Sequence, residues 1–61
     1  MKKEFVERVM REGSVDTNTY RYKLVHKEDA CKQWAEIQRL PLSLLDTTAA
    51  LSDWETVEVI Q

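Results

Sequence analysis

The chain has 61 residues, of which 43% are hydrophobic and 33% charged, with one glycine, one proline and one cysteine. A chain of this length forms at most one domain, here residues 1–61, with too little interior for a substrate cleft. No apolar run reaches the roughly 20 residues of a membrane-spanning helix, and a single cysteine excludes an internal disulfide. We therefore expect a small non-enzymatic domain of the cytoplasm, without a cofactor.

The formal net charge of −2 is unevenly divided along the chain. Residues 1–27 carry a net +3, whereas residues 28–61 carry a net −5 and have no basic residue after Arg39. Either the two halves form a basic and an acidic face, or their opposite charges neutralise each other across a compact domain.

Residues 4–12 are compatible with a helix or with a strand. Four of their side chains would form one apolar face of a helix: Phe5, Val6, Val9 and Met10. Gly13 also stands where a helix commonly ends. However, the segment precedes a turn-rich stretch, residues 13–18, and then a strong strand, which is the order of a β-hairpin. Because a sheet of two strands is only marginally stable, we predict a strand over residues 4–12.

Residues 19–26 predict a strand with one buried face. Aromatic and aliphatic side chains at Tyr20, Tyr22 and Leu24 alternate with basic ones at Arg21 and Lys23. This two-residue period is typical of a strand that covers a core on one side and faces water on the other.

Residues 27–40 predict a helix. Ala30, Trp34 and Ile37 follow the spacing of one helix face. Acidic residues in the first turn and a basic residue in the last complement the helix dipole. We expect this face to pack against the tyrosine side of the preceding strand.

The remaining segments complete the predicted fold. Residues 54–60 alternate and are rich in valine, which predicts a final strand. The connection over residues 42–53 is apolar but irregular, and it could contain a short helix that starts near Asp46. The predicted architecture is a small single α+β domain of ββαβ order. Its three-stranded, mainly antiparallel sheet carries the helix on one face, and the last strand pairs with the first.

No catalytic or metal-binding residue is predicted. His26 and Cys31 are the only pair with nucleophile or ligand chemistry, and a metal site needs three or four ligands. A Cys–His catalytic pair also needs an orienting group and an oxyanion pocket, for which the chain is too small. We interpret Cys31 as a small apolar residue and His26 as a capping or solvent-facing side chain.

The acidic C-terminal segment predicts a protein-binding surface. Tryptophan is enriched at binding hot spots, and Trp54 lies between Asp53 and Glu55, with Glu58 further along the predicted strand. An acidic rim would steer the domain onto a basic patch of a larger protein. Alternatively, Trp54 covers the rim of a small core. If the last strand lies at a sheet edge, it could also recruit a strand from a partner or from a second copy, giving a homo-oligomer.

Nucleic-acid binding is the second hypothesis. It would use the basic residues of the first half: Arg8, Arg11, Arg21, Lys23 and Lys27. Tyrosines interleaved with cations are typical of surfaces that bind single-stranded nucleic acids. Here strand alternation puts the tyrosines on the buried face, so that the exposed face has cations without stacking rings. A self-associating structural protein is the third hypothesis.

The strand TYRYKLV, the predicted helix and the strand WETVEVI follow one another between residues 19 and 60. This order resembles that of small phage inhibitors of host enzymes, including those that bind bacterial RNA polymerase. The resemblance covers element order, size and acidity, and it assigns no residue. It implies an inhibitor, adaptor or accessory subunit that occludes a surface of a larger protein in the host cytoplasm.

Overall fold

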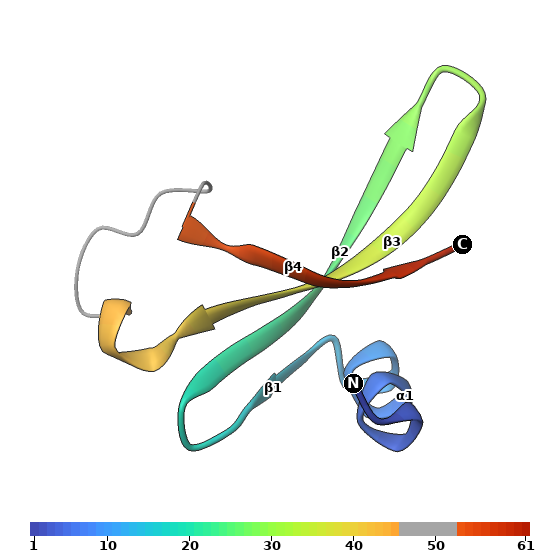
Figure 1. Cartoon of the computed structure of the whole chain (residues 1–61). Coiled ribbons are helices and arrows are strands. Elements are labelled where there is room, and N and C mark those ends of the chain that lie inside the picture. The colour runs from blue at the N-terminus through green and yellow to red at the C-terminus, as the bar shows by residue number, and fades with distance from the viewer. Residues whose placement is uncertain (46–52) are drawn as a thin grey trace.

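The computed structural model describes residues 1–45 and 53–61 and shows a small α+β fold (Figure 1). In these ranges one helix precedes an antiparallel sheet of four strands, which lie side by side in their chain order. The elements are α1 (Lys3–Glu12), β1 (Ser14–Asp16), β2 (Tyr20–Asp29), β3 (Lys32–Pro41), the 3₁₀ helix η1 (Leu42–Leu44) and β4 (Glu55–Ile60). The predicted α+β class is confirmed, whereas the predicted ββαβ order and the three-stranded sheet are wrong.

The first segment is helical, so the predicted strand over residues 4–12 is wrong. The side chains that α1 turns toward the sheet belong to the apolar stripe of the helical alternative: Phe5, Val6 and Val9. The helix ends at Gly13, whose N–H donates to the Val9 carbonyl at 2.7 Å and whose φ is 85°. The strand prediction depends on the need for a third strand, and β1 and β3 supply the extra strands instead.

Residues 27–40 form strands, so the predicted helix is wrong. β2 continues to Asp29, the chain turns at Ala30 and Cys31, and β3 then pairs with β2 along its whole length. The turn contains no glycine, asparagine or proline, which are the usual sequence signals of a hairpin. Instead, the Asp29 carboxylate accepts a hydrogen bond from the Ala30 N–H at 2.8 Å.

The helix-like spacing of apolar residues in β3 has a different origin. Successive strand side chains point to opposite faces, so Trp34 and Ile37 lie on opposite sides of the sheet. Ile37 is fully buried, whereas Trp34 is half-buried. A strand with apolar residues on both faces has no clean two-residue period, and helical spacings then arise by chance. Ile37 does reach Tyr22 and Leu24 as expected, but from a strand.

The predicted final strand over residues 54–60 is confirmed as β4. It pairs with β3 over residues 35–39, with a register shift after Ile37. The prediction that it pairs with the first strand is wrong, because each strand pairs with its neighbour in sequence. The predicted short helix near Asp46 lies outside the described residues.

The core lies between α1 and one face of the sheet. Leu40, near the end of β3, is fully buried outside this core. Within the core, Val9 and Ile37 are fully buried, and Val15 is nearly so. Half-buried apolar side chains pack around these three residues: Phe5, Val6, Tyr22, Leu24, Val57 and Ile60. The Phe5 and Tyr22 rings meet edge to face with their centroids 4.8 Å apart, an arrangement that aromatic quadrupoles favour. α1 thus lies over β1 and β2 on one face of the sheet, and the end of the β2–β3 hairpin projects beyond it (Figure 1).

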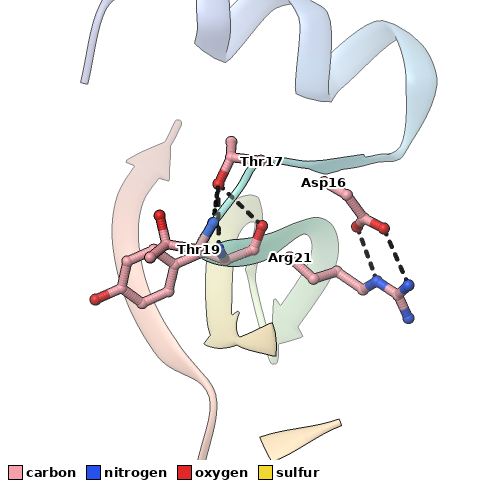
Figure 2. Close-up of polar contacts among 5 residues, drawn as sticks. Asp16, Thr17, Thr19 and Arg21 are labelled. Carbon is pink, nitrogen blue, oxygen red and sulfur yellow. Dashed lines mark hydrogen bonds and ion pairs between the residues drawn. The ribbon is translucent and has the colours of Figure 1, made fainter. Parts of the chain in front are cut away.

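Polar contacts in the β1–β2 turn hold the short strand β1 on the sheet (Figure 2). The Thr17 hydroxyl accepts a hydrogen bond from the Tyr20 N–H and donates one to the Tyr20 carbonyl, each at 3.1 Å. Arg21 donates two bonds to Asp16, of 2.8 and 3.0 Å, which lower the pKa of Asp16 and raise that of Arg21. Because water screens this exposed pair, its role is to set the register of the hairpin rather than to add much stability.

Replacing Gly13 tests the junction between α1 and β1. A Cβ at this position would meet no atom within 4 Å, so the cost of Gly13→Ala is the backbone strain at positive φ. We expect a loss of about 1–2 kcal/mol in the free energy of unfolding. Gly13→Asn should cost less, because asparagine tolerates positive φ better. Urea unfolding followed by tryptophan fluorescence measures both, with the exposed Ser14→Ala as control. A Gly13→Ala variant as stable as this control would contradict the positive φ of Gly13 between α1 and β1.

Candidate binding surface

The sheet face opposite α1 gathers polar and aromatic side chains of β2, β3 and β4. Strand alternation turns every second residue of β2 to this side, because Tyr22 and Leu24 point into the core. The β3 residues that pair with these outward-facing residues of β2 belong to the same face. So do Thr56, near the start of β4, and Trp54, just before β4. We call this surface the open face. It consists of Lys23, Val25, Lys27, Trp34, Glu36, Gln38, Trp54 and Thr56. Val59, which pairs with Glu36, lies on the same side, as does the pair of Arg21 with the fully buried Leu40 at the end of the sheet near the β1–β2 turn.

Glu36 connects the centre of the open face. One carboxylate oxygen accepts a hydrogen bond from the Trp34 indole N–H at 2.9 Å. The other accepts bonds from the Thr56 hydroxyl at 3.0 Å and from the Gln38 amide at 3.3 Å. The bonds from Trp34 and Thr56 lower the pKa of Glu36 below its usual value, with smaller effects from Gln38 and the charge of Lys27, while burial opposes the shift. Glu36 therefore stays ionised near neutral pH and orients three neighbouring side chains.

Both tryptophans of the chain lie on the open face, and a polar neighbour holds each of them. The Trp34 indole N–H is bonded to Glu36. The Lys23 ammonium lies 4.0 Å from the centroid of the Trp54 ring, a cation–π contact worth about 0.5–1 kcal/mol near a surface. Both side chains are half-buried, so part of each remains accessible. The open face thus has partly accessible aromatic side chains that contacts within the chain hold in place.

The residues of the predicted acidic surface lie on different sides of the sheet. Trp54 belongs to the open face, and Asp53 is exposed directly before it. Glu55 accepts a bond from Arg39 at 3.1 Å on the side of the sheet that carries α1. Glu58 is half-buried and pairs with a core residue of β3 on that same side. The structure therefore does not bring Glu55 and Glu58 onto the surface that carries Trp54.

The predicted basic residues are also divided. Arg8 and Arg11 belong to α1, where Arg8 pairs with Glu12 at 3.0 Å. The other three alternate along β2 and lie on the side of both tryptophans: Arg21, Lys23 and Lys27. The sequence predicts no aromatic ring beside these cations, because it assigns Trp34 to a helix.

Sequence reasoning also missed three polar residues of the open face: Glu36, Gln38 and Thr56. A signal for two of them existed, since Trp34, Glu36 and Gln38 alternate with Ala35 and Ile37. That alternation becomes visible only if residues 32–41 are taken as a strand.

His26 and Cys31 lie near the projecting end of the β2–β3 hairpin, and both are exposed. Within residues 1–45 and 53–61, no group of three or more His, Cys, Asp or Glu side chains is arranged to hold a metal ion. In the same part of the chain, no helix is both long enough and apolar enough to cross a membrane.

The Glu36 contacts make stability depend on pH. Because the pKa of Glu36 in the fold lies below the usual 4.5, the unfolded chain takes up the proton more readily. The free energy of unfolding should therefore fall as the pH drops through this range. Between about pH 6 and about pH 3, Glu36→Gln should lose less stability than the parent chain. Urea unfolding across this range measures the difference, with Glu7→Gln on α1 as control. Equal losses in the parent chain and Glu36→Gln would mean that the Glu36 bonds do not form.

No family model, no curated protein and no solved structure matches this chain. The resemblance to small phage inhibitors depends on a strand–helix–strand order between residues 19 and 60. The observed order there begins with two strands, β2 and β3, and ends with β4, so the resemblance gives no support. Function is therefore inferred from the surface of the chain itself.

Proposed function

We propose that the chain is a non-enzymatic protein-binding module that engages a larger protein through the open face. The observation that carries the proposal is the position of Trp34 and Trp54, both on the sheet face that α1 does not cover. Tryptophan dominates binding energy at many interfaces, where it fills a pocket on the partner. Glu36 and Lys23 hold the two rings in advance, which lowers the entropy lost on binding.

The charges around the tryptophans favour a polar partner surface of mixed sign. Lys23, Lys27 and Glu36 lie within the open face, and the exposed Asp53 directly precedes Trp54 in the chain. Rim charges mainly steer the approach of a partner, whereas buried aromatic side chains supply affinity. A module of this kind acts by occlusion, as an inhibitor, adaptor or accessory subunit inside the cell.

Trp34→Ala tests the open face. The core formed by Val9 and Ile37 lies on the other side of the sheet, so we expect the variant to remain folded. Immobilised parent chain should capture a discrete protein from a lysate of the cells in which it occurs. Trp34→Ala should reduce the capture at least tenfold, as loss of a hot spot of about 2 kcal/mol would. Met10→Ala removes an apolar side chain that is exposed on α1 and is the matched control. Equal capture by Trp34→Ala and Met10→Ala would mean that the open face does not bind the captured protein.

Nucleic-acid binding is kept as a second candidate because Arg21, Lys23 and Lys27 share a side of the sheet with both tryptophans. Cations beside aromatic rings bind single strands through phosphates and stacked bases. Against this, Arg21 is engaged by Asp16, Glu36 lies at the centre of the face, and the net charge of the chain is −2.

We expect no binding of a single-stranded oligothymidylate at low salt, measured by quenching of tryptophan fluorescence. Binding that weakens steeply with added salt and is lost in Lys27→Glu would make nucleic acid the partner instead. Arg11→Glu on α1 is the control for the change of net charge.

A further inference from the structure

We propose that the outer edge of β4 takes up an extended, basic segment of a protein partner as an additional strand of the sheet. Such an addition presupposes the protein-binding function proposed above and defines the chemistry of the partner. Three features of the chain favour it: the position of β4 in the sheet, the charge along β4, and a hollow beyond its C-terminal end.

β4 lies at one end of the strand order and pairs with β3 on its inner side. Among the residues that the structure describes, no strand pairs with its outer side. On such an edge every second residue turns its N–H and C=O outward, where an extended chain can bind them. Val59 is 49% exposed and offers an apolar contact beside this backbone. The edge thus has both backbone groups and a side chain for strand addition.

The charge of β4 selects a basic partner segment. β4 contains Glu55 and Glu58 and neither lysine nor proline, the residues that often protect natural edge strands from pairing. Arg39 partly neutralises Glu55, so Glu58 is the main acidic side chain at the centre of the edge. A lysine or arginine opposite Glu58 would be favoured, whereas an acidic residue there would be repelled.

A second copy of the chain is a poorer occupant than a basic segment. Pairing two β4 strands would bring both copies of Glu55 and Glu58 to one seam, with no lysine or arginine on either strand. Like charges on neighbouring strands destabilise a sheet. A segment in which basic and apolar residues alternate instead matches both the carboxylates and Val59.

A hollow continues the edge beyond the end of β4. The pairing of β3 with β4 stops at Ala35, although β3 begins earlier in the chain. The hollow lies next to this part of β3, which pairs with β2 but not with β4. It is lined by Trp34, Val59 and Gln61 together with Asp29, Cys31, Lys32 and Gln33 of the hairpin end. A strand that runs past Ile60 would place an apolar side chain against Trp34 and Val59. Because Trp34 belongs to the open face, the edge and the open face are parts of one continuous surface.

A peptide titration tests strand addition directly. The probe is a capped peptide of about six residues, the usual length of a strand, in which lysine and valine alternate. Added to the ¹⁵N-labelled chain, it should shift the amide resonances of residues 55–60 and slow hydrogen exchange at those of them whose N–H groups point away from β3. A second peptide of equal charge, with proline in place of two valines, cannot pair as a strand and should bind at least about tenfold more weakly.

Two variants separate the edge from general electrostatics. Glu58→Lys should weaken binding of the lysine–valine peptide several-fold, whereas Glu7→Lys, the same change of charge on α1, should not. Val59→Lys places a cation at an exposed position of β4 and should weaken binding as well, which keeps the test valid if Glu58→Lys fails to fold. Unchanged resonances of Val9 and Ile37 report that each variant is folded.

Several outcomes would overturn strand addition. These are equal binding of the proline peptide, no binding at all, and shifts confined to residues outside β4 and the hollow. Slow exchange along β4 without peptide, together with a mass that rises with concentration, would assign the edge to a second copy. If the peptide does not bind at β4 but Trp34→Ala still loses capture of the partner protein, strand addition is wrong and the open-face proposal stands. Peptide binding at β4 with no effect of Trp34→Ala on capture rejects the open face alone.

Discussion

The structure depends on the burial of one apolar stripe of α1 against one face of a single sheet. Val9, Val15 and Ile37 meet there and exclude water. A helix of ten residues is about 15 Å long, whereas the ten-residue strands β2 and β3 extend over about 33 Å. One short helix therefore cannot cover the sheet. The opposite face of the sheet and the end of the β2–β3 hairpin are not covered by α1.

This incomplete cover explains the chemistry of the open face. A sheet face that is exposed to water needs polar side chains. Pairing of the three strands also brings these side chains close enough to one another to interact. Glu36 uses this proximity to bind side chains from its own strand and from β4. The same arrangement holds two tryptophans in a partly accessible position, so the constraint that limits the core also leaves both rings at the surface. The outer edge of β4 extends that surface, because Trp34 and Val59 lie at the point where the two meet.

Sequence patterns identified some elements correctly because their signals are local. The alternation around Tyr20 to Leu24 and the valines of β4 each reflect a strand with one buried side. The apolar stripe of residues 4–12 and Gly13 also indicated a helix, and the strand prediction failed because it relied on counting strands elsewhere. β3 was not predictable in the same way, since its apolar residues lie on both faces and its turn lacks glycine. Within the candidate surface, Trp54 was recognised from the sequence because acidic residues flank it. Trp34 and Glu36 were not recognised, because they reach the open face only if residues 32–41 form a strand.

By itself, the sequence indicated the strands β2 and β4 and the apolar stripe of α1, and it excluded an internal disulfide. The α+β class was predicted correctly, although the helix was placed at residues 27–40 and not at Lys3–Glu12. These properties follow from composition and from periods of two to four residues, which any local segment expresses. Only the tertiary structure decided that residues 32–41 form a strand, that β4 pairs with β3, and that both tryptophans share one face with Lys23 and Glu36. The physical reason is that strand pairing and the choice of a buried face join residues far apart in the chain. A ten-residue segment with apolar side chains on both sides gains its strand form only from the neighbours that bury them.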